Sequence, residues 1–142
     1  MTKLNRLAKK LKLDKATNAA LANPPAGYAD SLQPLPEGAS LSAKLSSGHD
    51  WIQIFVKTQA EFETQLPKTL KAMAEQCTLW ISFPKGSSGI QTDLTRDQGW
   101  DTLTEVDLRF VTLVAVDDTW SAIGLRSYKP GEERVPNPFL RR

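Results

Sequence analysis

Hydrophobic positions along the chain follow two different periods, and each period predicts a kind of element. A nearly continuous apolar run over residues 51–56 indicates a strand that is buried on both faces of a sheet, and residues 77–83 indicate another buried strand. A shorter run over residues 18–22 ends at Asn23-Pro24-Pro25, which is typical of a strand stopped by a turn. Residues 40–45 alternate apolar and polar side chains, so they predict an edge strand with one face in water.

Apolar residues at helical spacing predict three helices. The first lies within residues 3–12, and we expect its apolar stripe to cover the edge of the domain. The second starts at Thr58, which has the capping-box spacing to Glu61, and Pro67 is expected to kink it or to start another helix. The third starts near Thr95. The apolar positions are Leu4, Leu7, Ala8 and Leu11, then Phe62, Leu66, Leu70 and Met73, then Trp100, Leu103 and Val106.

The last two predicted strands, over residues 108–116 and 120–125, are separated only by Asp117-Asp118-Thr119. So short a connection requires an antiparallel hairpin. Strands that alternate with helices favour a three-layer, Rossmann-like α/β fold with a mostly parallel six-stranded sheet and this hairpin at its C-terminal end. Five strands are expected to be parallel, and the antiparallel one is expected to lie next to the fourth. The predicted organisation is a basic N-terminal arm (1–16), a single α/β domain (17–128) and an extended or disordered tail (129–142).

Composition narrows the classes of function. The chain has 142 residues and a net charge of +2. Residues 1–15 contain six basic residues against Asp14, so the rest of the chain is net acidic and binding of nucleic acid by the domain is disfavoured. No apolar run is long enough to cross a membrane. The single cysteine, Cys77, is expected in the core and the cytoplasm is the expected compartment.

Several polar residues follow predicted strands and are expected at one edge of the sheet. Asn23 and Tyr28 follow the first strand, Lys85 follows the fourth, and Asp117 with Asp118 follows the fifth. The carboxyl ends of parallel strands are where α/β proteins bind ligands, so these loops form a candidate binding site.

The segment Lys85-Gly86-Ser87-Ser88 has the chemistry to bind an anion through one cation, a flexible backbone and two hydroxyls. The alternative is a solvated loop in which Lys85 pairs with Asp117 or Asp118. These aspartates have the oxygen ligands for Mg²⁺ or an acid–base role beside Lys85, although aspartate is also favoured in turns for structural reasons. Trp120 adjoins the same edge and has a ring that stacks on ligands.

Other chemically suggestive residues have structural explanations. Asp93, Arg96 and Asp97 lie where a helix begins and are expected to cap it. The only histidine, His49, precedes a strand at the opposite edge and is expected on the surface. With no Cys/His cluster, no metal site and no catalytic residue are predicted.

A Rossmann-like sheet that ends in a helix and an antiparallel hairpin resembles the class I methyltransferase fold. The segments Asp50–Val56 and Thr78–Pro84, with a helix between them, are similar to the middle of such enzymes, and the likeness in element order covers residues 17–128. Where that fold has a glycine-rich cofactor loop, this chain has Asn23-Pro24-Pro25-Ala26-Gly27. Because proline has no N–H to donate and fixes the backbone, we expect no S-adenosylmethionine and no other cofactor.

The chain also resembles a family of small bacterial proteins of unknown function. The shared features are a Pro-Lys pair after a strand, a Thr-Arg-Asp-x-Gly-Trp helix start and an Asp-x-x-Trp-Ser hairpin. They correspond here to Pro84-Lys85, Thr95–Trp100 and Asp117–Ser121. This resemblance implies no particular activity.

The function that these observations favour is a non-catalytic, methyltransferase-like domain that binds a small anionic ligand or a protein partner at the carboxyl edge of the sheet. One alternative is an enzyme that uses Lys85 and Asp118 in a cleft at this edge. Another is a structural or assembly protein in which residues 40–45 or the N-terminal helix mediate a homodimer.

Overall fold

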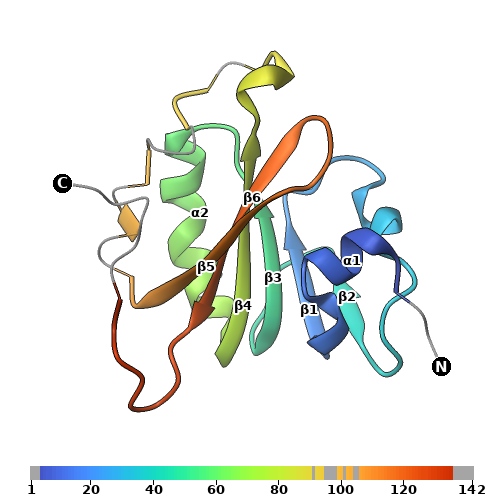
Figure 1. Ribbon diagram of the computed structural model, residues 1–142, viewed down its shortest axis with the longest axis vertical. Coiled ribbons are helices and arrows are strands. Elements are labelled where there is room, and N and C mark those ends of the chain that lie inside the picture. Colours follow the sequence, from blue (N-terminus) through green and yellow to red (C-terminus); the bar gives the residue numbers. More distant parts are fainter. Residues whose placement is uncertain (1–3, 91, 95–98, 101, 104–105, 136–142) are drawn as a thin grey trace.

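Six strands form one sheet in the order β2-β1-β3-β4-β6-β5 (Figure 1). The computed structural model describes residues 4–90, 92–94, 99–100, 102–103 and 106–135. β1 pairs in parallel with β2 and β3, and β3 pairs in parallel with β4. The strands are β1 (Asn18–Ala22), β2 (Ser40–Ser42), β3 (His49–Phe55), β4 (Met73–Pro84), β5 (Leu108–Ala115) and β6 (Trp120–Ser127).

The C-terminal hairpin makes this a mixed sheet. β6 is antiparallel to both β4 and β5, so β5 runs in the same direction as β4. The predicted antiparallel strand next to the fourth strand is therefore confirmed. The hairpin twists away from the plane of β1–β3, as Figure 1 shows.

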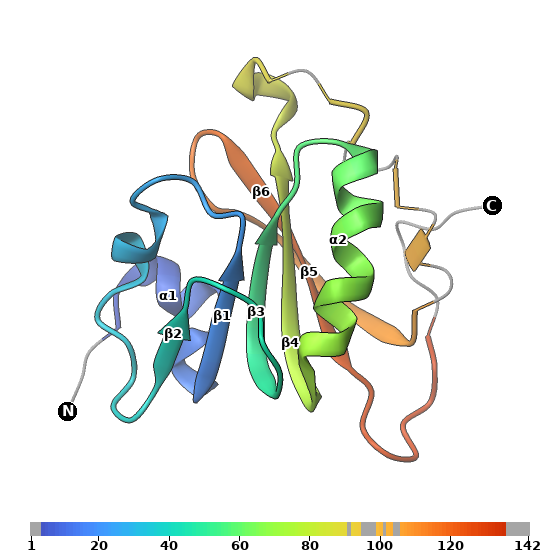
Figure 2. The ribbon, with the colours of Figure 1, turned by 180° about the vertical axis from the view of Figure 1, so that it is seen from behind.

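One face of the sheet is covered by α2 (Gln59–Ala72), the long helix in Figure 2. The predicted capping box is present, since the Thr58 side chain accepts a hydrogen bond from the Glu61 N–H. The helix runs unbroken through Pro67, so the second helix that we considered does not form. Phe62 and Leu66 are buried against β3 and β4 and form the core of this side.

The opposite face has a more irregular cover. It consists of α1 (Arg6–Lys10) and the 3₁₀ helices η1 (Leu13–Lys15) and η2 (Tyr28–Leu32). α1 is shorter than the predicted helix over residues 3–12, and its buried residue, Ala8, belongs with Trp51 and Trp80 to a second core. The N-terminal apolar stripe therefore covers a face of the sheet, where we had expected it to cover an edge. Within the described residues, helices are fewer than the expected three-layer arrangement requires.

Two further predictions need correction or fall outside the structure. β2 ends at Ser42, whose hydroxyl accepts a hydrogen bond from the Lys44 N–H and turns the chain before the predicted end at Leu45. The predicted start of the third helix, Thr95 to Gln98, lies outside the described residues. No helix in the described part of the chain has the length and apolar character to cross a membrane.

The beginning of the predicted tail is held by ion pairs. Glu132 accepts hydrogen bonds from Arg109 at 2.6 Å and from Arg126 at 2.7 Å. These contacts hold the pKa of the Glu132 carboxyl well below its usual range, chiefly through Arg126. Arg134 pairs with Asp107 and lies 4.2 Å from the centre of the Tyr128 ring. Residues 129–135 are therefore tied to the hairpin.

Candidate functional site

The topology leaves a crevice between the carboxyl ends of β1 and β3. The chain passes from β1 to β2 on one side of β1, and β3 pairs on its other side, so the direction of strand addition reverses here. Ligands of open α/β sheets bind at such a switch point. A hollow of about 310 Å³ occupies it. We call it the switch-point crevice, and it is lined by Asn23, Pro24, Pro25, Phe55, Lys57, Glu61 and Trp120.

Trp120 forms one wall of the switch-point crevice. Its ring packs edge-on against Phe55, with ring centres 5.0 Å apart, and only 6% of the residue is exposed. Among the described residues, the indole N–H has no hydrogen-bond partner. Asp117 fixes the backbone here, because its carboxylate accepts hydrogen bonds from the N–H groups of Thr119 and Trp120. The turn-forming explanation of Asp117 therefore accounts for its contacts.

Lys57 is a cation of this crevice that the sequence analysis missed. It stands two residues after the end of β3, and it is exposed. Its backbone N–H donates to Glu61 at 2.9 Å, which holds the start of α2 beside the crevice. The available signal was its position, because the residue after a buried parallel strand lies at the same edge as Asn23 and Lys85.

Tyr28 lies below the crevice and does not line it. It is buried, its ring packs edge-on with Phe55 at 4.7 Å, and its hydroxyl donates to the Gln53 side chain at 2.7 Å. Gln53 in turn donates to the Ser82 hydroxyl at 2.9 Å. Burial raises the pKa of Tyr28 well above its usual value, the hydrogen bond with the Gln53 side chain opposes the rise, and the Asp117 charge adds to it. Tyr28 therefore supports the crevice floor as a neutral phenol.

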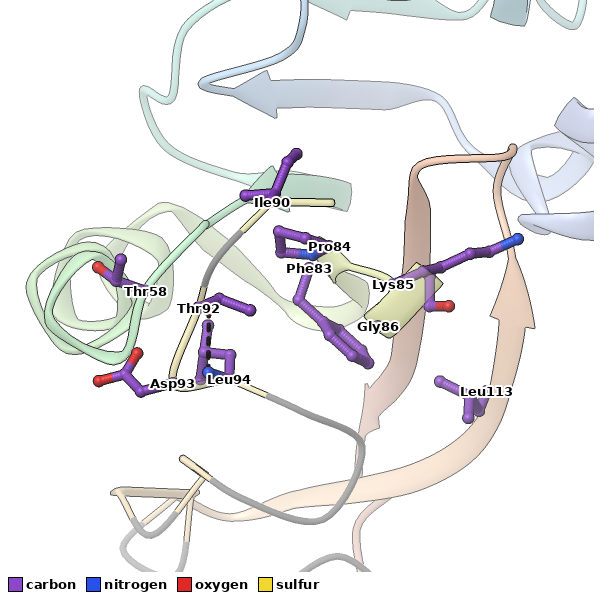
Figure 3. Close-up of a pocket in the computed structure, with 11 residues that line it drawn as sticks. Thr58, Phe83, Pro84, Lys85, Gly86, Ile90, Thr92, Asp93, Leu94 and Leu113 are labelled. Carbon is purple, nitrogen blue, oxygen red and sulfur yellow. Dashed lines mark hydrogen bonds between the residues drawn. The ribbon is translucent and has the colours of Figure 1, made fainter. Parts of the chain in front are cut away.

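The loop after β4 meets the hairpin turn, as the sequence analysis expected. The Lys85 N–H donates to the Thr119 carbonyl at 2.8 Å, so Pro84–Ser88 and Asp117–Thr119 are neighbours. Within the described residues, however, Lys85 forms no ion pair with Asp117 or Asp118. The Lys85 ammonium instead extends away from Thr58 and Asp93 (Figure 3).

The hollow beside this loop is larger and mainly apolar. It measures about 800 Å³, and its lining includes Phe83, Pro84, Leu94 and Leu113. Ser87 is exposed, and Ser88 accepts a hydrogen bond from the Ile90 N–H within the short helix η3 (Gly86–Ser88) and its C-terminal turn. Lys85 and Gly86 of the predicted anion-binding segment also line this hollow.

Asp93 caps a helix, but a different one from the helix expected. Its carboxylate accepts a hydrogen bond of 2.7 Å from the Gln59 N–H, in the first turn of α2. The loop after β4 is thereby fastened to α2. Arg96 and Asp97 lie outside the described residues.

His49 is buried, so its predicted surface position is wrong. It lies at the amino end of β3, as expected, but its ring contacts Asn18 and accepts a hydrogen bond from the Ser46 N–H at 3.0 Å. It cannot reach the opposite edge, where the switch-point crevice lies. The described residues contain no group of three or more His, Cys, Asp or Glu side chains arranged to hold a metal ion.

The sheet order and the crevice define an α/β domain with a methyltransferase-like fold. A SAM-dependent methyltransferase from Aquifex aeolicus is similar over 87% of this chain and 88% of its own, with a TM-score of 0.64 and 10% sequence identity. Fibrillarin, a pre-rRNA processing protein of Methanococcus jannaschii, is similar over 90% of this chain and 72% of its own, with a TM-score of 0.56 and 10% identity. No protein-family model and no curated protein matches the sequence. At this identity the likeness shows the fold alone.

Proposed function

We propose that the protein is a non-catalytic, methyltransferase-like domain that binds a small anionic ligand in the switch-point crevice. The observation that carries this proposal is the pairing of an exposed cation, Lys57, with the indole of Trp120 in one hollow at the switch point of the sheet. An ammonium and an indole N–H are both donors, and an anionic ligand supplies the acceptors that they need.

The composition of the crevice favours binding over catalysis. The loop after β1 carries Pro24 and Pro25, which have no N–H groups with which to hold the phosphates or carboxylate of a nucleotide-like cofactor. The lining contains no histidine or cysteine, and His49 is buried at the other edge. Glu61 is the one carboxylate in the lining, and it accepts a hydrogen bond from the Lys57 backbone. The lining therefore lacks the residue types that most often serve as nucleophile or general base, and its one carboxylate contacts the backbone before α2.

The test is titration of the full chain with AMP, pyrophosphate and S-adenosylmethionine, followed by tryptophan fluorescence and by calorimetry. We expect AMP or pyrophosphate to bind, and we do not expect S-adenosylmethionine to bind, because its sulfonium gives it a net positive charge. Lys57→Ala should weaken the binding of the anion about tenfold, since a hydrogen bond to a charged group contributes about 1.5–3 kcal/mol. Lys68→Ala, on an exposed part of α2 away from the crevice, is the matched control.

Two outcomes contradict the proposal. Either none of the anions binds, or Lys57→Ala and Lys68→Ala bind equally well. Transfer of a methyl group from S-adenosylmethionine to water or an added acceptor, lost in Lys85→Ala or Asp118→Ala, would establish the enzymatic alternative instead.

A further inference from the structure

A second groove lies on the face of the sheet that α1 covers, at the end of the strands opposite to the switch-point crevice, and it extends to the first residues of β4. It consists of two hollows of about 300 Å³ and about 280 Å³, which share Lys15, Thr78 and Arg126 and are therefore continuous. The face concerned is the one toward the viewer in Figure 1, between the N-terminal helices and the twisted strand β5. The floor is formed by β4 and β6.

The walls of this groove differ in character. Lys12 and Lys15 from the N-terminal segment line one wall, and Val111 of β5, which is 38% exposed, lines the other. Lys129 extends the basic lining at one end. We call this feature the lysine groove. Within the described residues, none of its three lysines forms an ion pair.

The acidic residues nearby do not neutralise these lysines. Asp50 is the only carboxylate in the lining, and it accepts hydrogen bonds from the N–H groups of Thr17 and Asn18. Burial disfavours the charged form of Asp50, but these hydrogen bonds outweigh it and hold the pKa below its usual value. Arg126 already pairs with Glu132 through two hydrogen bonds of 2.7 and 3.0 Å. The unpaired charge of the groove is therefore positive.

The backbone that carries Lys12 is held in an unfavourable conformation by specific contacts. Lys12 has φ of 63°, in the left-handed region that glycine and asparagine usually occupy. The adjacent Leu11 carbonyl accepts hydrogen bonds from two buried indoles, Trp51 at 2.8 Å and Trp80 at 2.7 Å. These two contacts fix the turn and with it the place of the lysine. A disfavoured conformation that the surroundings maintain points to a role for the residue that occupies it.

Glycine at position 124 shapes the floor. A Cβ atom there would lie 2.6 Å from the Trp80 ring, so only glycine lets the indole pack flat on β6. Trp80 is fully buried beneath the groove, with no exposed ring surface. The floor is thus closed and offers no aromatic platform to a nucleic-acid base.

We propose that the lysine groove binds an extended acidic peptide segment of a partner protein. Its unpaired lysines match carboxylates, and Val111 offers an apolar contact to the side chains between them. The bidentate Arg126–Glu132 pair shows, within the chain itself, how a carboxylate is held at this place. Single-stranded nucleic acid is the less suitable polyanion, because stacking on exposed aromatic rings is missing. The inference is independent of the ligand proposed for the switch-point crevice.

The experiment measures the fluorescence anisotropy of three labelled probes with the full chain. They are a peptide of alternating Glu and Val, the same peptide with Gln for Glu, and an oligouridine of equal length. We expect the Glu-Val peptide to bind most tightly and the affinity to fall as salt is added. Tighter binding of oligouridine, or equal binding of the Gln-Val peptide, would overturn the proposal, as would absence of binding by all three.

Two variants locate the binding. Lys12→Gly removes a cation and suits the left-handed backbone, so the chain stays folded while peptide affinity falls roughly threefold to fivefold. Lys12→Gly with Lys15→Glu lowers it by about tenfold or more. The double variant Lys44→Glu with Lys68→Glu controls for the change in net charge, because both lysines line a different hollow. It should leave the peptide affinity nearly unchanged. Equal losses in control and test variants would place the binding elsewhere.

Discussion

The two faces of the sheet are covered in different ways. On one face, the regular helix α2 buries Phe62, Leu66 and Ala72 against β3 and β4, and its ends are defined by local capping. On the other face, short helical pieces are held by polar contacts from far along the chain. The Leu11 carbonyl receives the indole N–H groups of Trp51 and Trp80, 40 and 69 residues away.

The difference shows that burial of apolar side chains holds the cover of one face, whereas polar contacts hold the cover of the other. A helix of 14 residues brings enough apolar surface to the sheet for burial alone to hold it. A five-residue helix such as α1 does not, since short helices are marginal by themselves. It needs contacts that fix its position, and the two buried indoles supply them at the Leu11 carbonyl.

The largest expected effect tests burial on the α2 face. Phe62→Ala removes a fully buried ring that packs edge-on against Trp100, with ring centres 4.9 Å apart. The lost transfer free energy and the remaining cavity together lower the free energy of unfolding by about 3–5 kcal/mol. Urea denaturation measures the change. Glu63→Ala, at an exposed position on the same helix, should change it little, and a Phe62→Ala loss as small as that of Glu63→Ala would show that burial does not hold this face.

The second prediction tests the polar contacts of the other face. Tyr28→Phe leaves the ring in place and removes the hydrogen bond to the buried Gln53 side chain. An acceptor without its donor in the core costs about 1–3 kcal/mol of unfolding free energy. Tyr128→Phe removes the chain's other tyrosine hydroxyl at a more exposed site and should cost less than about 1 kcal/mol.

A double-mutant cycle sharpens this result. In a Gln53→Leu background, Tyr28→Phe should have a much smaller effect, because the partner is already gone. If Tyr28→Phe costs as much with Leu as with Gln at position 53, the hydrogen bond does not hold this face, and packing of the ring against Phe55 accounts for the loss.

The same difference explains how much of the fold could be predicted from the sequence. Periodicity reports local burial, so the strands, α2 with its capping box, and the hairpin were recognised from spacing alone. The extent of α1 was wrong, because the left-handed conformation of Lys12 is maintained by two tryptophans distant in sequence. His49 was misplaced for a similar reason. Asn18 and Ser46 satisfy both of its ring nitrogens, and no local pattern encodes such a pair.

For the candidate site, the sequence predicted which loops meet but not the directions in which their side chains point. The sequence located the carboxyl edge and the meeting of the loops at Lys85 and Thr119. It could not show that Tyr28 turns inward to Gln53 or that Asp93 caps α2. Those contacts depend on packing between elements, which a single sequence does not display. Lys57 was within reach of the argument, since it stands one residue after the strand predicted over residues 51–56.

The smallest expected effect is a loss of stability at alkaline pH, which begins at a different pH for a buried group on each face. Burial, with a contribution from the Asp50 charge, raises the pKa of Cys77 on the α2 side to about 12. The unfolded thiol ionises at about pH 8.5–9, so the unfolded state loses its proton first. The stability that the neutral thiol contributes is complete below that pH and is lost as the pH rises toward the folded value. Tyr28, on the other face, contributes a similar loss only above about pH 10.

We therefore expect the wild-type chain to lose about 1 kcal/mol of unfolding free energy relative to Cys77→Ala between about pH 8 and about pH 9.5. Urea denaturation at each pH measures the difference between the two chains, so that groups common to both cancel. Alkylation by iodoacetamide at about pH 8 gives an independent reading, because a buried neutral thiol reacts at least about a hundredfold more slowly than in the unfolded chain. Parallel stability curves for the two chains, or rapid alkylation of the folded protein, would mean that the α2 face is open to solvent at Cys77, and that burial closes this face less completely than the polar contacts close the other.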